Sequence, residues 1–406
     1  MITEVIPGAR SVALGVMVAA GSRFELDDQQ GSSHLLEHLL FRGSAHYDGR
    51  SIADLLDRFG GDSNAYTDKE VMTAYVRTLP ERTAEALRLL TSVILAPTLD
   101  PAAVSSELAV VSDEILSRDD EPADIAGTAF EELCFPGHQL GRDVLGTEET
   151  LRRLDADALR RFHDATYGTA RMVVLAVGAV DHEVIVELTD TLVVARPATQ
   201  AVRTAPDLPS PSTRVIDQAG SQAHVVLGTP LGPLEPKERA ALGVLSHLLG
   251  GGVSSRLFRQ VREERGLAYG VGTELSLYAG AGSISAYAAS APDAMGEVIE
   301  LLAAAFDEAA GGAVSDEEVE RSTEALRTDL LLSADEPLTR LGRLGADALI
   351  HEAVIESSQR VALLESLDVD DVRTMASRIA LGPTVATLVG PVRPSAVAAL
   401  DRVVGR

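Results

Sequence analysis

The chain has 406 residues, more than one ordinary hydrophobic core accommodates, so we expect two domains of roughly 200 residues each. A hydrophobic content of 46% is that of a globular protein. The formal net charge of -26 argues against nucleic-acid binding, which needs a basic face. The single cysteine, Cys134, excludes an intramolecular disulfide and a thiolate zinc cluster.

The apolar segments are too short to cross a bilayer. The run 11–21 is apolar but only half as long as a membrane-spanning helix. It is not followed by the small-residue cleavage site of a secretory signal peptide. We therefore expect a soluble protein of the cytoplasm.

Strands and helices alternate along the first half of the chain. Residues 9–22 have the composition of a buried strand, and residues 62–78 show the alternation of β structure. The pair Asp100-Pro101 is a typical helix start, with Asp as the N-cap and Pro at the first helical position. The expected helices are 31–43, 51–59, one from Pro80, one from Asp100-Pro101, 123–134 and 149–166, before a strand at 172–177.

Residues 196–213 contain four prolines and no apolar period, which indicates a linker. The sequence after it repeats features of the sequence before it. Tyr75-x4-Pro80 is matched by Tyr287-x4-Pro292, and Asp120-Glu-Pro122 is matched by Asp335-Glu-Pro337. The sequence therefore predicts two homologous domains, 1–195 and 214–406.

Each half is expected to be an α+β domain, an antiparallel-rich sheet covered by helices. Strand 223–229 and helix 237–249 take the places of the first strand and the first helix of the chain. The second half lacks the histidine motif described next, so we expect one active site and a metal-free C-terminal domain.

The motif lies in residues 31–44, which read GSSHLLEHLLFRGS. His34 and His38 are four residues apart and share one face of a helix, which either Gly31 or Ser33 can cap. Two imidazoles at this spacing suit one divalent metal, and Glu37 between them is placed to accept a proton from water. A buried histidine can also be a plain core residue, but two with an intervening glutamate favour a metal site.

A catalytic zinc needs a third protein ligand. Glu107 and Glu114 are seven residues apart, two helical turns, and therefore share a face. Spacing alone does not choose between them, and either could belong to a solvated helix face.

Several motifs together resemble the pitrilysin/insulinase family of zinc peptidases, in particular the branch of bacterial processing proteases and the mitochondrial processing peptidase β subunit. They span most of the chain. They are His34-x2-Glu-His38, Gly60-Gly-Asp-Ser-Asn-Ala-Tyr-Thr67, Glu107-x6-Glu114, Pro136-Gly-His-x-Leu-Gly-x4-Gly-Thr-Glu148, Leu249-Gly-Gly-Gly-Val-Ser-Ser-Arg-Leu-Phe258 and Arg262-Glu-Glu-Arg-Gly-Leu-Ala-Tyr269.

The resemblance implies roles for the residues of the first motif and of the glutamate pair. His34, His38 and Glu114 would bind one Zn²⁺ per chain, Glu37 would be the general base, and Glu107 would orient a histidine. Manganese or cobalt stays open, because N and O ligands accept several metals.

The resemblance also implies substrate contacts. Asn64 and Ala65 would pair with the substrate backbone, and Phe41 would line the pocket near the scissile bond. Arg262 and Tyr269 would hold the peptide and stabilise the tetrahedral intermediate.

The implied protein is an endopeptidase that cleaves short or unfolded peptides inside a clamshell of two halves. A homodimer is expected. The alternatives are the metal-bearing subunit of a heterodimeric peptide-maturation protease, paired with a homologue that lacks the motif, and an inactive scaffold subunit.

Overall fold

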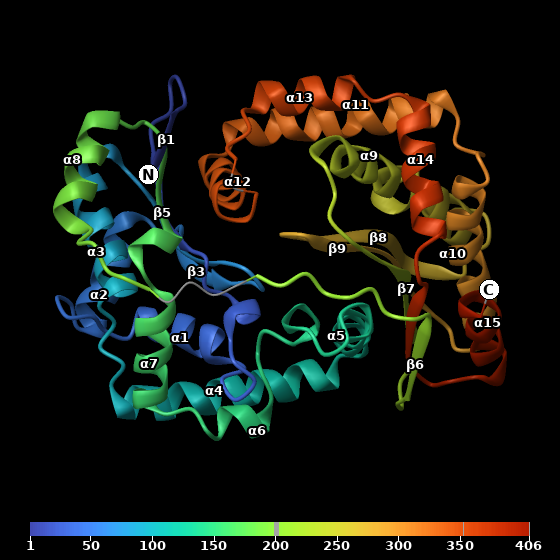
Figure 1. Cartoon of the computed structure of the whole chain (residues 1–406), viewed down its shortest axis with the longest axis horizontal. Coiled ribbons are helices and arrows are strands. Elements are labelled where there is room, and N and C mark those ends of the chain that lie inside the picture. Colours follow the sequence, from blue (N-terminus) through green and yellow to red (C-terminus); the bar gives the residue numbers. More distant parts are fainter. Residues whose placement is uncertain (199–202, 352, 406) are drawn as a thin grey trace. The chain divides into compact units, whose positions relative to one another are not determined.

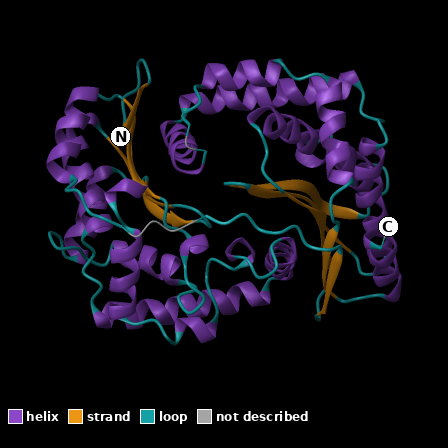
Figure 2. Ribbon diagram, in the orientation of Figure 1, coloured by secondary structure: helices purple, strands orange, loops and turns teal. Residues whose placement is uncertain are grey.

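The computed structural model describes residues 1–198, 203–351 and 353–405. The chain forms two compact units, each made of three segments. Unit 1 contains 1–116, 142–203 and 331–355, and unit 2 contains 117–141, 204–330 and 356–406. Figure 1 traces the elements along the chain, and Figure 2 shows that each unit is a sheet with helices packed on it.

The sheet of unit 1 has five strands in the order β1-β5-β2-β4-β3. Strand β1 pairs parallel to β5, and the other neighbours are antiparallel. The bounds are β1 Ile2–Val5, β2 Val12–Val18, β3 Ser63–Thr67, β4 Met72–Thr78 and β5 Met172–Gly178.

Both faces of this sheet are covered. Alternate residues of β2 point to opposite sides: Leu14 and Val16 join the core formed with the helices of the first half, whereas Ala13 and Met17 pack in a second cluster with Leu341. The helices on the first side are α1 Ser32–Leu40, α2 Gly49–Phe59, α3 Thr83–Leu95, the first part of α4 Pro101–Asp120, α7 Ala156–Thr166 and α8 His182–Leu192.

The sheet of unit 2 repeats this topology. Its order is β6-β10-β7-β9-β8, with β6 parallel to β10 and the rest antiparallel, so each strand matches one in unit 1. The internal repeat predicted from the sequence is thereby confirmed, as is the α+β class. The bounds are β6 Ser212–Asp217, β7 Ala223–Leu231, β8 Ala268–Tyr278, β9 Ala281–Ser290 and β10 Val385–Gly390.

The helices of unit 2 also form a core on one face of the sheet. They are α9 Pro236–Ser246, α10 Met295–Ala310, α11 Asp316–Leu332, α13 Ser357–Glu365, α14 Val369–Ala380 and α15 Pro394–Val404.

Each sheet receives one helix from the other half of the sequence. Helix α5, Pro122–Cys134, packs on β7 and β10 of unit 2, and helix α12, Pro337–Ile350, packs on β2 and β5 of unit 1. The compact units therefore differ from the predicted contiguous halves 1–195 and 214–406. The apolar face of a helix predicts that the helix is buried, but it does not predict which of the two sheets the helix packs on. Of the expected linker 196–213, residues 199–202 lie outside the described part of the chain.

One expected helix is divided. Residues 149–166 form α6, Glu148–Leu151, and then α7, because the Asp155 carboxylate accepts a hydrogen bond from the Ala158 N–H and starts a new helix. Among the helices in the described residues, none is both long and apolar enough to cross a membrane.

Candidate metal centre

Helix α1 holds both motif histidines because its other side is anchored in the core of unit 1. Leu35, Leu36, Leu39 and Leu40 are almost fully buried there, with exposed fractions of 1% or less. At the start of the helix, the N-cap residue Gly31 has a left-handed φ of 90° and offers no side-chain oxygen.

The cap comes from the loop before the helix. The buried carboxylate of Glu25 accepts hydrogen bonds from the backbone N–H of Gly31, at 3.0 Å, and of Ser33, at 2.6 Å. These two donors are among the N–H groups at the start of the helix, for which the helix itself provides no acceptor. Gly31 is thus the N-cap, as one of the two sequence alternatives had it, but an acidic side chain satisfies the amides.

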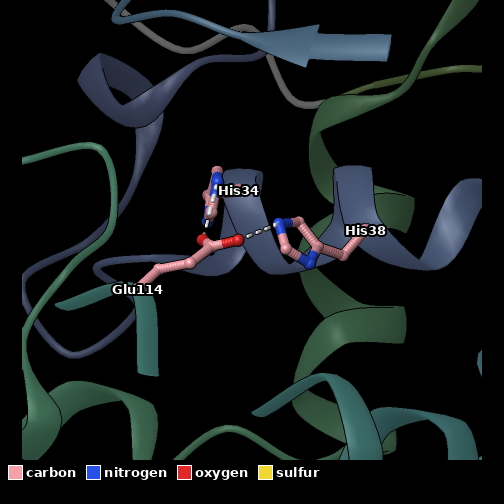
Figure 3. A group of neighbouring side chains, drawn as sticks. All are labelled: His34, His38 and Glu114. Atoms are coloured by element: carbon pink, nitrogen blue, oxygen red, sulfur yellow. Dashed lines mark ion pairs between the residues drawn. The ribbon is translucent and has the colours of Figure 1, made fainter. Parts of the chain in front are cut away.

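Three potential ligands meet at the free face of α1 (Figure 3). His34 Nε2 lies 3.7 Å from Glu114 Oε2, and His38 Nε2 lies 3.6 Å from Glu114 Oε1. One ligand atom from each residue can be chosen so that all lie within 4.8 Å of one another. Among the described residues, this is the one such group of three or more His, Cys, Asp or Glu side chains.

These separations fit a single divalent ion. Two ligand atoms each about 2.1 Å from a tetrahedral zinc are about 3.4 Å apart, close to the two N···O distances here. Burial, and to a lesser extent the nearby His38, lowers the pKa of His34 from 6.5 to about 4, so its imidazole is neutral at pH 7. A neutral imidazole is the form that binds a metal. The donor set therefore fits zinc.

Glu107 lies behind His38. Its side chain is only 4% exposed, and its Oε2 lies 3.1 Å from His38 Nδ1. Its other oxygen, Oε1, forms an ion pair with Arg42 Nη2. Glu114 rather than Glu107 thus reaches the face shared by both Nε2 atoms, the arrangement implied for a ligand and its supporting group.

Glu37 projects from the same helix toward the end of strand β3. Burial raises the pKa of the Glu37 carboxyl and the charge of Glu114 adds to this, while the nearby His38 and hydrogen bonding with Thr67 oppose the rise. A carboxylate with a raised pKa is a stronger base than an ordinary one, which suits a proton acceptor.

The expected substrate residues of unit 1 lie near this helix. Asn64 and Ala65 are on β3, the edge strand of the sheet, and the Ala65 N–H donates to the Asn64 side-chain carbonyl at 2.9 Å. Phe41 is the C-cap residue of α1 and is partly buried against the core. Strand β3 contacts α1, and Thr67 at its end donates to the Ser33 carbonyl at 3.4 Å.

Arg262 and Tyr269 belong to unit 2 and contact each other. The Arg262 guanidinium lies 4.4 Å from the Tyr269 ring centroid and donates a 3.2 Å hydrogen bond to the Tyr269 carbonyl. Tyr269 is 79% exposed and lies at a register shift of the edge strand β8, between Ala268 and Gly270. Such irregularities re-aim a side chain.

Sequence reasoning assigned no role to three residues around the motif: Glu25, Arg42 and Thr67. Arg42 continues the four-residue spacing of His34 and His38, a signal that was present in the sequence. Glu25 gave no such signal, because a capping carboxylate six residues before the N-cap Gly31 looks in the sequence like any other acidic residue of a loop.

Two imidazoles and one carboxylate, with a further glutamate beside them, are the ligand class and proton acceptor of a zinc peptidase. The family profile described as Insulinase (Peptidase family M16) matches residues 1–148, and that described as Peptidase M16 inactive domain matches residues 153–326. The chain belongs to the M16 family of peptidases, the pitrilysin/insulinase family.

Curated relatives agree over nearly the whole length. The chain is 33% identical to an uncharacterized zinc protease of Mycobacterium tuberculosis, covering 96% of this chain and 91% of that protein. It is 31% identical to one from Streptomyces coelicolor, covering 97% and 88%, and 31% identical to one from Bacillus subtilis, covering 86% of each. These names support a peptidase and suggest zinc.

Solved structures share the fold. One is the peptidase M16 inactive domain from Pseudomonas fluorescens, with a TM-score of 0.89, 20% identity, and coverage of 96% of this chain and 95% of that one. Another is a protease from Helicobacter pylori, with a TM-score of 0.88, 20% identity and 96% coverage of each chain.

Proposed function

We propose that this protein is a zinc-dependent endopeptidase that hydrolyses short or unfolded peptides. The observation that carries the proposal is the grouping of His34, His38 and Glu114, each of which offers one ligand atom within 4.8 Å of the others, with each histidine Nε2 facing one oxygen of Glu114. Family membership and the names of the relatives support the reaction class.

Bound zinc would supply Lewis-acid polarisation of the scissile carbonyl and a lowered pKa of water, to about 7. The chain's own residues do the rest. His34, His38 and Glu114 would hold the ion, and Glu107 would accept a hydrogen bond from the Nδ1–H of His38, which leaves Nε2 free to bind. Glu37 takes the proton of the attacking water and passes it to the leaving amine.

The peptide would add to the sheet of unit 1 as an extended strand. Strand β3 pairs with β4 on one side and is the last strand of its sheet, so its outer edge at Asn64 and Ala65 suits β-augmentation once the Asn64 side chain releases the Ala65 N–H. Main-chain hydrogen bonds would supply affinity, and side chains such as Phe41 would supply preference. Arg262 and Tyr269 would steady the substrate and the developing oxyanion.

The resemblance extends the proposal to a cytoplasmic homodimer whose paired halves enclose the peptide, so that size and flexibility select the substrate. A chain that needs a partner lacking the motif, or one that serves as a scaffold, would cleave no peptide when it is purified alone.

The test pairs metal content with cleavage. The chain is purified alone, its zinc is measured, and wild type and Glu37→Gln are incubated with a mixture of unstructured peptides that is read by mass spectrometry. We expect one zinc per chain in both, and chelator-sensitive cleavage by wild type only. Zinc without cleavage would show that a partner subunit is required, and neither zinc nor cleavage would refute the proposal.

A further inference from the structure

Glu107 is a buried carboxylate whose two oxygens have different partners. Its side chain is 4% exposed, Oε2 faces His38 Nδ1 at 3.1 Å, and Oε1 faces the Arg42 guanidinium. An ionised carboxylate withdrawn from water is strongly disfavoured unless a cation compensates it. Of these two ion-pair partners, only Arg42 carries a permanent charge.

Arg42 is held where it can make this contact. It lies four residues after His38, just beyond the end of α1, and its N–H donates a 3.1 Å hydrogen bond to the Leu39 carbonyl. Its own carbonyl packs against Gly49, where an added Cβ would lie 2.8 Å from the oxygen. The backbone of Arg42 is thus confined on both sides, and the guanidinium reaches Glu107 from a defined starting point.

We propose that Arg42 is a positioning residue of the metal centre: by pairing with the buried Glu107 carboxylate, it fixes the orientation and tautomer of His38. With Oε1 held by the guanidinium, Oε2 stays directed at Nδ1, the Nδ1–H donates to it, and Nε2 is turned toward Glu114 at 3.6 Å. This inference rests on the proposed metal site.

Loss of the guanidinium frees the Glu107 carboxylate to rotate away from His38 Nδ1, and His38 is then no longer held in the metal-binding orientation. The effect on the metal is indirect, since Arg42 touches none of the three ligands' metal-facing atoms. Partners of this kind typically change metal affinity by about 10–100-fold when removed. The Arg42 side chain is also 57% exposed, so a direct contact with substrate is the competing role, and the test must separate the two.

Zinc affinity is measured by competition with a chromogenic chelator for wild type, Arg42→Ala, Arg42→Lys and Arg153→Ala. Arg153 is a matched control, because its side chain is 56% exposed and pairs with Glu149, a carboxylate that is itself 73% exposed. We expect Arg42→Ala to bind zinc about tenfold more weakly. The zinc affinity of Arg42→Lys should stay within about threefold of wild type, because the positive charge is kept. The small remaining loss reflects the missing planar guanidinium. Arg153→Ala should bind zinc as wild type does.

Two further measurements test the route through Glu107. In a Glu107→Gln background, Arg42→Ala should cause no additional loss of zinc affinity, because residues that act through one carboxylate are not additive. In zinc-loaded protein with labelled histidine, the His38 Nδ1–H resonance should be sharp in wild type and broadened in Arg42→Ala.

Several results would overturn the proposal. Arg42→Ala with wild-type zinc affinity and an unchanged His38 signal would leave Arg42 no role at the metal. A loss of equal size in both backgrounds would show that Arg42 acts independently of Glu107. A wild-type chain that binds no zinc is a separate result, and it would refute the proposed function itself.

Discussion

The carboxylate of Glu25 accepts a 2.6 Å hydrogen bond from the backbone N–H of Ser33, the residue immediately before His34. Its second oxygen accepts from the Gly31 N–H. The metal-binding helix therefore starts on a buried acid that comes from the preceding loop, and the position of both histidines depends on it.

Replacing Glu25 by alanine should lower the free energy of unfolding by about 2–6 kcal/mol, because two buried N–H donors lose their acceptor and each costs about 1–3 kcal/mol. Denaturant unfolding in the presence of a chelator measures this without the contribution of bound metal. Asp27→Ala, on an exposed side chain of the same loop, is the control and should change stability little. Equal effects of the two substitutions would show that Glu25 does not cap the helix.

The same residue makes stability depend on pH. Burial raises the pKa of Glu25 to about 7 from its ordinary 4.5, against the opposing pull of the hydrogen bonds and of Arg142. Between pH 4.5 and 7 the folded state binds more protons at this site than the unfolded state, so its contribution to stability is fully present below 4.5 and falls as pH rises to 7. The fall amounts to roughly 3 kcal/mol.

Glu25→Gln removes this titration and keeps an acceptor. Metal-free wild type and Glu25→Gln should therefore differ least at pH 4.5, where the protonated carboxyl resembles the amide, and most at pH 8, where Glu25→Gln should be the more stable protein. Their difference cancels the other titrating groups. Chemical denaturation across this range provides the test. If the difference between the two proteins is constant with pH, Glu25 does not titrate in this window.

The contact between helix α12 and the sheet of unit 1 is unusually close. A Cβ at Gly345 would lie 1.8 Å from Met17 Sδ and 2.9 Å from Leu175 Cδ1. Gly345→Ala should therefore destabilise the protein by about 1–3 kcal/mol through overpacking. Gly342→Ala in the same helix is the matched control, since its Cβ would meet nothing within 4 Å, and it should raise stability by up to about 1 kcal/mol. Equal melting temperatures for the two variants would contradict the packing of α12 on β2.

Much of the candidate site could be predicted because its geometry is local. His34 and His38 share a helix face by spacing, and Glu107 and Glu114 share another because α4 runs without a break from Pro101 to Asp120. The choice of Glu114 as a ligand needed the family resemblance. Two glutamates on one face of α4 are equivalent candidates until the position of α1, which carries the histidines, is known.

Other features could not be predicted because they depend on segments far apart in the sequence. The apolar faces of α5 and α12 show that both helices are buried, but not that each packs on the sheet of the other half. The pairing of Arg42 with Glu107 likewise joins two helices whose packing is a tertiary property. Local patterns give elements and faces, and the partners of those faces come only from the folded chain.

The two glutamates of α4 should differ in their effect on zinc. Glu114→Ala removes one of three ligands, so zinc affinity should fall by more than the roughly 10–100-fold expected for a group behind a ligand. The loss of zinc affinity in Glu107→Ala should lie within that range. Asp113→Ala, an exposed neighbour on the same helix, should bind zinc normally. Metal analysis after dialysis compares the three variants, and a Glu107→Ala protein that loses zinc while Glu114→Ala keeps it would reverse the assignment.

Tyr269→Phe removes only a hydroxyl. The ring that stacks against Arg262 remains, and the side chain is 79% exposed, so stability should stay within about 0.5 kcal/mol of wild type. If the hydroxyl stabilises the oxyanion, kcat should fall by about 10²–10³, the range for losing one such donor, while zinc content is unchanged because the residue lies outside the metal cluster. Steady-state kinetics on a peptide identified by mass spectrometry, with zinc measured on the same sample, decides the matter. An unchanged kcat would remove Tyr269 from the reaction, and a rise in KM alone would limit it to holding the peptide.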